Sequence, residues 1–108
     1  MDLAELETYV VNVRAERGFT REPVRLLALL VEEVGEVARE LKRTWSVNYE
    51  PFSTGRLADE LADVQTLVLA PSNAFGIDLE AACLAKLGKD AQREWRSASP
   101  ARPTEEPR

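Results

Sequence analysis

The sequence contains no histidine and only one cysteine, Cys83, in 108 residues. The absence of histidine excludes Ser-His and Cys-His nucleophilic catalysis and the usual zinc enzymes. A single cysteine cannot form an intrachain disulfide or a thiolate metal site, and its apolar neighbours in LEAACLAKL predict a core residue. A glycine-rich phosphate loop is also missing. Any catalysis must therefore use carboxylates, a metal ion and a few lysine and arginine side chains.

The sequence also lacks a long apolar run and an excess of positive charge. No stretch approaches the ~20 apolar residues of a membrane span, and the acidic N-terminus is unlike a signal peptide. We therefore expect a cytoplasmic protein with no membrane partner. The net charge of -5 argues against binding to nucleic-acid polymers, because that binding depends on clustered lysine and arginine. A free nucleotide that arrives with a metal ion remains compatible with this charge.

Helical periodicity and capping residues predict an all-α four-helix bundle. One domain is expected over residues 1–96, and the proline-rich segment 97–108 is expected to be a disordered tail. The first helix should run from Asp2 to about Glu16, and the second from after Thr20 to about Thr44. The third should begin at a cap on Ser53 or Thr54, and the fourth should run from a cap on Asp78 to near Trp95.

Two features of the middle helices bear on their packing. The second helix carries one apolar stripe, which we expect to lie near the buried side: Leu27, Leu30, Val34, Val37 and Leu41. In the third helix, Pro71 lacks an amide proton and should bend or end the helix about one turn before Gly76.

Two acidic pairs occur at helical spacing, Glu33 with Glu36 and Glu60 with Asp63. Residues three apart share a helix face, and a connection of about ten residues lets the second and third helices pack as antiparallel neighbours. The four carboxylates could then converge on one point, where Mg²⁺ or Mn²⁺ with oxygen ligands would supply the counter-charge. Alternatively, the pairs are solvated faces of amphipathic helices. The spacing alone leaves both interpretations open.

Three motifs in order resemble the MazG-like all-α nucleotide pyrophosphohydrolases: EEVGE (32–36), DELADV (59–64) and GIDLEAACLAKLGKDAQR (76–93). The resemblance covers about residues 8–95. It implies hydrolysis of a nucleoside triphosphate to a monophosphate and pyrophosphate, assisted by Mg²⁺ or Mn²⁺, in cleaning of the nucleotide pool. It also implies a homodimer or a homotetramer built as a dimer of dimers. The site residues that it implies are Glu33, Glu36, Glu60 and Asp63 as metal ligands and Glu32 as the base that orients or deprotonates water.

Other residues are candidates for substrate binding. Lys86, Lys89 and Arg93 recur at helical spacing, so they could contact the triphosphate, or they are ordinary surface cations near a helix C-terminus. Trp45 could stack on the nucleobase, as an aromatic residue does in similar proteins, or it could fill the core between helices. Asp90 stands where the family usually has asparagine, and it places a negative charge beside the presumed phosphate cations.

Two alternative functions are compatible with the same residues. Phosphoribosyl-ATP pyrophosphatase is a relative of similar length and motifs, and it differs in its substrate. A non-enzymatic helical oligomerisation module, whose acids only keep it soluble, differs in chemistry. If the chain is such a module, divalent metal should not stabilise it, because a ligand raises the melting temperature of a protein only by binding its native state.

Overall fold

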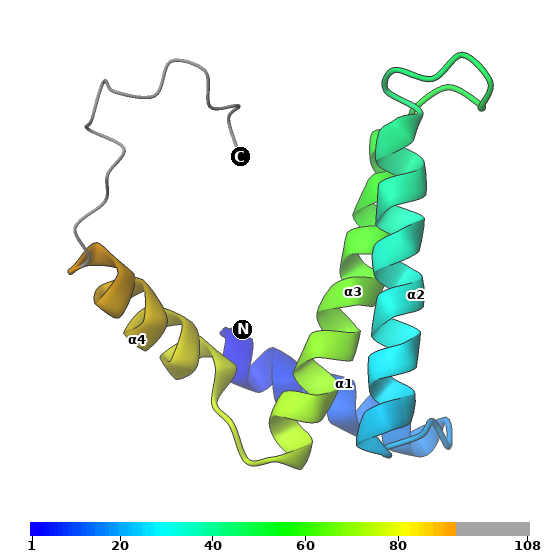
Figure 1. Cartoon of the computed structure of the whole chain (residues 1–108). Helices are drawn as coiled ribbons and strands as arrows, with labels where there is room; N and C mark the ends of the chain where they lie inside the picture. The colour runs from blue at the N-terminus through cyan, green and yellow to red at the C-terminus, as the bar shows by residue number, and fades with distance from the viewer. Residues whose placement is uncertain (93–108) are drawn as a thin grey trace.

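The computed structural model describes residues 1–92, which form four α-helices and no strand (Figure 1). The helices are α1 (Leu3–Glu16), α2 (Pro23–Lys42), α3 (Thr54–Ala74) and α4 (Leu79–Ala91). The predicted all-α class with four helices is confirmed. The expected tail and the last expected turn of the fourth helix lie outside the described residues. Within residues 1–92 no single helix is long and apolar enough to cross a membrane, although α3 and α4 together, with a 98° bend between them, meet that criterion.

Short-range sequence signals determine where the helices begin. Asp2 and Glu5 form a capping box, in which the Glu5 amide donates to the Asp2 carboxylate at 2.8 Å. Ser53 and Asp78 cap α3 and α4 in the predicted way, each by accepting a hydrogen bond from a first-turn amide. The cap of α2 is Glu22, whose pKa is lowered because its carboxylate accepts hydrogen bonds from two first-turn amides.

Pro71 does not end α3, which continues through it to Ala74. The missing amide of a proline removes one backbone hydrogen bond, but the rest of the helix can compensate for that loss. The Ser72 hydroxyl donates to the Val68 carbonyl at 2.9 Å in this last part of the helix. The chain then turns at Gly76, whose φ of 67° lies in the left-handed region that favours glycine.

The antiparallel pair α2 and α3 makes the most extensive helix contact in the described chain (Figure 1). Leu26 of α2 is 2% exposed and packs in one cluster with Leu67 and Ala70 of α3, with Leu30 against it. Helix α1 packs across α3 and buries Val10. The apolar core therefore lies at the end of the α2–α3 pair that is far from their connecting loop.

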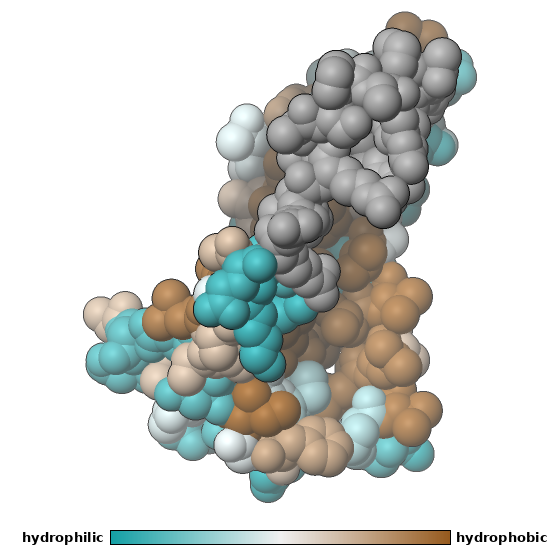
Figure 2. All heavy atoms as spheres, turned by 60° about the vertical axis from the view of Figure 1, so that its left-hand side comes forward, coloured by the Kyte–Doolittle hydropathy of each residue, from teal (hydrophilic) through white to brown (hydrophobic). Residues whose placement is uncertain are grey.

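The apolar stripe expected along α2 divides between two faces. Leu30 and Val37 are partly buried, whereas Leu27, Val34 and Leu41 are exposed. The expectation that the whole stripe lies near the buried side is therefore wrong within one chain, because the face toward α3 is centred on Leu26 and its neighbours instead. Apolar side chains, brown in Figure 2, accordingly form broad areas on the surface.

Helix α4 diverges from the α2–α3 pair and packs mainly against α1 (Figure 1). None of its described residues is buried, and Leu84 and Leu87 are both largely exposed. Cys83 is exposed as well, so the prediction of a core cysteine is wrong for the single chain. The apolar neighbours that suggested burial lie on a helix that little of the described chain covers.

Candidate metal centre

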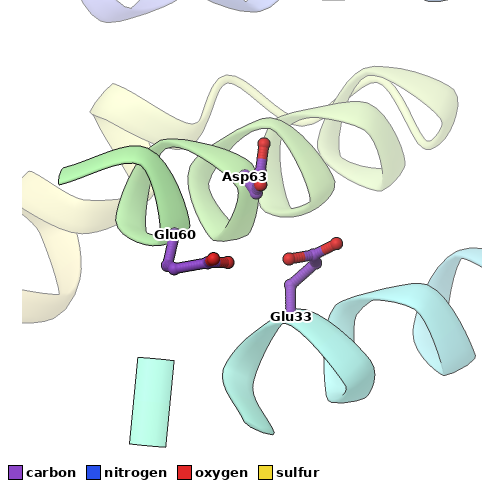
Figure 3. A group of neighbouring side chains, drawn as sticks. All are labelled: Glu33, Glu60 and Asp63. Atoms are coloured by element: carbon purple, nitrogen blue, oxygen red, sulfur yellow. The ribbon is translucent and has the colours of Figure 1, made fainter. Parts of the chain in front are cut away.

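Three carboxylates from two helices converge in the middle of the α2–α3 pair (Figure 3). Glu33 extends from α2 and Glu60 extends toward it from α3, while Asp63 lies on the adjacent turn of α3. One oxygen of each carboxylate lies within 4.8 Å of the chosen oxygens of the other two. The structure thus brings together three of the four side chains that were expected to ligate a metal.

Glu33 and Glu60 lie on the same helix faces as partly buried aliphatic residues of α2 and α3. On α2, Glu33 is partly buried and lies between Leu30 and Val37, which are partly buried about one turn away on either side. On α3, Glu60 is partly buried and is likewise flanked by partly buried aliphatic residues, Leu57 and Val64. The helix packing therefore holds two carboxylates at the contact between α2 and α3.

Burial and neighbouring carboxylates both act on Glu33. The pKa of Glu33 is raised, first by partial burial and then by the negative charges of Asp63, Glu60, Glu32 and Glu36. Such a concentration of carboxylates favours binding of a cation. The donor set contains only oxygen, which suits a hard divalent ion such as Mg²⁺ or Mn²⁺.

Glu36 and Glu32 lie beside the converging group. Both are near enough to raise the pKa of Glu33, but the three oxygens that approach within 4.8 Å belong to other residues. Glu36 is partly buried and lies about one turn from Glu33, toward the loop between α2 and α3. Glu32 is exposed. The site therefore consists of three close carboxylates with two more at its border.

A cavity of about 560 Å³ adjoins the acidic group, next to α1 and the α2–α3 pair. Its volume lies in the range of small-molecule pockets. Glu33 and Asp63 line part of the wall. Cationic and aromatic side chains from α1 and the turn after it line another part: Tyr9, Arg14, Arg17 and Phe19. Negative, positive and aromatic groups thus face one cavity.

The turn after α1 fixes part of this wall. Gly18 has a φ of 68°, which allows the chain to reverse, and the Phe19 amide donates to the Arg14 carbonyl at 3.0 Å. The Arg14 guanidinium lies 5.2 Å from the centre of the Phe19 ring and donates to the Thr20 carbonyl at 3.3 Å. These residues were not among those predicted from the sequence. The only available signal was two arginines near the end of the first expected helix.

The residues expected to bind substrate are not gathered at this cavity within one chain. Lys86 and Lys89 are exposed on α4, where Lys86 forms an ion pair with Asp90 at 3.1 Å. Arg93 lies outside the described residues. Trp45 is 72% exposed after the end of α2, so it does not fill the core between helices. Among the described residues, neither the two lysines nor Trp45 lines the cavity.

Residues 21–95 match the sequence model of the MazG nucleotide pyrophosphohydrolase domain. The match covers most of the chain and includes every acidic residue of the site described above. It begins after α1, so Arg14 and Arg17 lie outside it. No curated protein matches the sequence significantly.

Proposed function

Because the chain belongs to the MazG nucleotide pyrophosphohydrolase family, we propose that it hydrolyses nucleoside triphosphates to monophosphates and pyrophosphate. The convergence of Glu33, Glu60 and Asp63 beside a nucleotide-sized cavity carries this proposal. The substrates are non-standard or surplus triphosphates, whose removal cleans the nucleotide pool.

The three converging carboxylates would hold the divalent ion, with Glu36 as a further ligand. The donor set fits such an ion because it is made of closely spaced carboxylate oxygens. The pKa of Glu33 is raised by partial burial and then by the neighbouring negative charges, which a cation would offset. A bound Mg²⁺ or Mn²⁺ would screen the phosphate charges and lower the pKa of a bound water. The role of the helices is to hold the ligands in place before the substrate arrives.

Other side chains would act on the water and on the substrate. Glu32 is an exposed carboxylate at the border of the site, where it would accept the proton of the attacking water. Arg14 and Arg17 would donate to phosphate oxygens, since guanidinium groups form strong charge-assisted hydrogen bonds with phosphate. The aromatic rings of Tyr9 and Phe19 offer flat apolar surface for the nucleobase.

We further propose that the working unit is a homodimer or a pair of dimers. The outer face of α2 carries exposed aliphatic residues spaced by three, four, three and seven positions, which is typical of a helix that packs on another helix. These residues are Val24, Leu27, Val31, Val34 and Leu41. A second copy that covers this outer stripe and α4 could bring Lys86, Lys89, Arg93 or Trp45 to the substrate.

The test is release of pyrophosphate from a panel of ribo- and deoxyribonucleoside triphosphates and phosphoribosyl-ATP, with Mg²⁺ or Mn²⁺. We expect Asp63→Asn to lose metal affinity and rate together. Glu32→Gln should keep its metal affinity and lose ~100-fold or more in rate, the usual contribution of a general base. Glu16→Gln is the matched control, because it removes an exposed carboxylate at the end of α1.

The outcomes separate the alternatives. A strong preference for phosphoribosyl-ATP would assign the chain to that pyrophosphatase. A protein that releases no pyrophosphate from any compound, and whose melting temperature neither metal raises, would be the non-enzymatic oligomerisation module. Equal turnover by wild type and Glu32→Gln would overturn the role of Glu32 as the base.

A further inference from the structure

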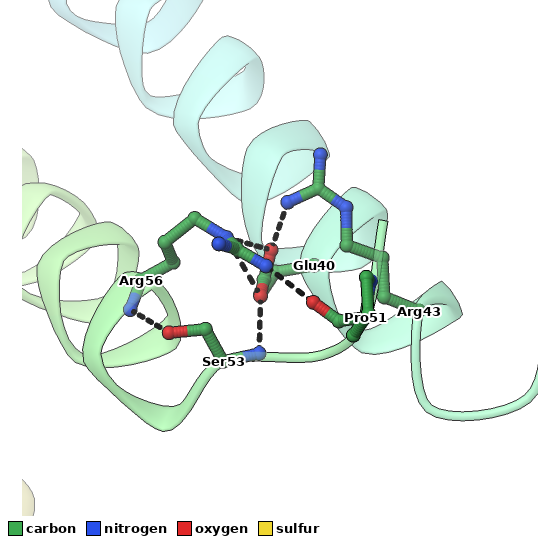
Figure 4. A network of polar contacts seen from close by, with 5 residues as sticks. All are labelled: Glu40, Arg43, Pro51, Ser53 and Arg56. Carbon is green, nitrogen blue, oxygen red and sulfur yellow. Dashed lines mark hydrogen bonds and ion pairs between the residues drawn. The ribbon is translucent and has the colours of Figure 1, made fainter. Parts of the chain in front are cut away.

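A buried carboxylate joins α2 to the beginning of α3 (Figure 4). Glu40 is only 2% exposed. The Ser53 amide donates to its Oε1 at 2.9 Å, and Arg56 Nε donates to both of its oxygens at 3.2 Å. Arg43, from the end of α2, pairs with the same carboxylate. Arg56 also donates to the Pro51 carbonyl, so the contacts link α2, the loop and α3.

The partners of Glu40 keep it charged despite its burial. Burial alone would raise the pKa of this carboxyl, but the hydrogen bonds from Ser53, Arg56 and Arg43 outweigh that effect and lower it. A buried charge that loses its partner is strongly destabilising. Helix α3 therefore cannot shift along α2 without separating Glu40 from Arg56 and leaving a buried charge less well paired.

The contacts between the two helices repeat at the same interval on both. Successive members of each series are seven positions apart, which corresponds to about two turns, or ~10.5 Å. The α2 series is Leu26, Glu33 and Glu40, and the α3 series in antiparallel order is Ala70, Asp63 and Arg56. The acidic group thus lies midway between an apolar cluster at one end and the ion pair at the other.

We propose that Glu40 and Arg56 are positioning residues, which fix the register of α3 along α2 and thereby hold the metal-binding carboxylates together. This inference rests on the proposed function. The carboxylates repel one another and favour separation of the helices when no ion is bound. A slip of one helical turn would move Asp63 by ~5.4 Å relative to Glu33. Since Mg²⁺ binds oxygen at ~2.0–2.1 Å, no ion could then contact both helices as before.

Glu40 is buried, but 43% of the Arg56 side chain is exposed, so this ion pair is only partly buried. Replacing both partners of an ion pair by apolar side chains often costs no stability, whereas a specific charge pair disfavours wrong registers. The two functions can be measured separately here, because Arg43 and Arg56 contact the same carboxylate from different elements. Arg43 lies at the end of α2, so its contact with Glu40 does not depend on the register of α3. Arg43→Met is therefore the matched control for Arg56→Met.

The experiment measures the Kd for Mn²⁺ by calorimetric titration and the melting temperature of the metal-free protein. We expect both variants to melt below wild type. Only Arg56→Met should raise the Kd, by ~10-fold or more, which is the usual effect of losing a residue that orients metal ligands. Arg56→Lys keeps the charge but contacts the carboxylate through one atom, so its Kd should lie between those of wild type and Arg56→Met. If Arg56→Met does not fold, Arg56→Lys alone should still raise the Kd.

The results distinguish this inference from the proposed function. If Arg56→Met folds and binds Mn²⁺ as tightly as wild type, the positioning role is overturned while the metal site stands. If Arg43→Met weakens Mn²⁺ binding as much as Arg56→Met does, the pair contributes only general stability and the inference is wrong. If wild type itself does not bind Mn²⁺ or Mg²⁺, the proposed function fails first.

Discussion

Removing one charge from the acidic group should stabilise the metal-free protein and reduce its response to metal. Glu33→Gln keeps the shape of the side chain, and the pKa of Glu33 is raised by partial burial and then by the negative charges of its neighbours. The oxygens lie within 4.8 Å of one another, and at that limit two unit charges repel by about 1 kcal/mol in water and by about 3.5 kcal/mol at an effective dielectric of 20. Because the group is partly open to solvent, we take about 1 kcal/mol for each of its two contacts, with Glu60 and with Asp63.

The assay is a thermal melt at fixed protein concentration with and without Mn²⁺. A gain of about 2 kcal/mol should raise the metal-free melting temperature by roughly 10 °C, since each kcal/mol shifts a domain of this size by about 4–8 °C. At 100 times the wild-type Kd, Mn²⁺ adds about 2.7 kcal/mol to wild type. At the same concentration, a variant that binds 100-fold more weakly gains only about 0.4 kcal/mol. Mn²⁺ at this concentration therefore cancels the higher stability that Glu33→Gln has without metal.

Glu16→Gln is the control, because it changes the net charge equally at an exposed position on α1. It should melt like wild type and respond to Mn²⁺ like wild type. The electrostatic reasoning is refuted if metal-free Glu33→Gln melts at or below wild type. A full response of Glu33→Gln to Mn²⁺ would instead show that Glu33 is not a ligand.

Three further changes test the outer stripe, the cavity and the Glu40–Arg56 pair. If the proposed oligomer forms through the outer stripe, Val31→Glu in its middle should give monomers in sedimentation velocity. Val47→Glu, at a position 96% exposed, should leave the oligomeric state of wild type unchanged. Arg17→Met should raise KM for the triphosphate by ~10-fold with little change in kcat, and Arg25→Met, away from the cavity, should leave both unchanged. The lowered pKa of Glu40 means that its stabilising contribution is complete above its ordinary value of 4.5 and is lost as the pH falls through the lower folded value. Wild type should therefore lose stability more steeply than Glu40→Gln below about pH 4.5 in acid titrations followed by circular dichroism, and equal slopes would contradict this assignment.

The features that the sequence predicted well depend on interactions between residues close in the chain. The capping box of Asp2 and Glu5 and the caps at Ser53 and Asp78 are each formed within three residues, so their signals are complete in the sequence. The proline was harder to interpret. Pro71 lies near the end of α3, where loss of one hydrogen bond is tolerated because neighbouring packing holds the helix.

The features that the sequence did not predict depend on which surfaces meet in three dimensions. Helix α2 carries aliphatic residues on two faces, and periodicity cannot tell which face meets α3 and which is left exposed by the chain. The residue that packs against α3 is Leu26, while Leu27 is exposed. The same difficulty explains Cys83, whose apolar neighbours lie on a face that the chain itself leaves open. Arg14 was missed because its place in the cavity depends on how α1 crosses α3.

The seven-residue repeat explains how one helix pair can carry an acidic group that opposes its own folding. The cluster around Leu26 and Ala70 and the pair Glu40–Arg56 restrain α2 and α3 on both sides of Glu33. Each restraint lies about two turns from the acids, near enough to resist separation and too far to neutralise them. The negative charge therefore stays available to a cation. Weakening either restraint should reduce metal affinity at conditions where the helices are still folded. The site depends on the register of α3 along α2, whereas the folding of each helix does not.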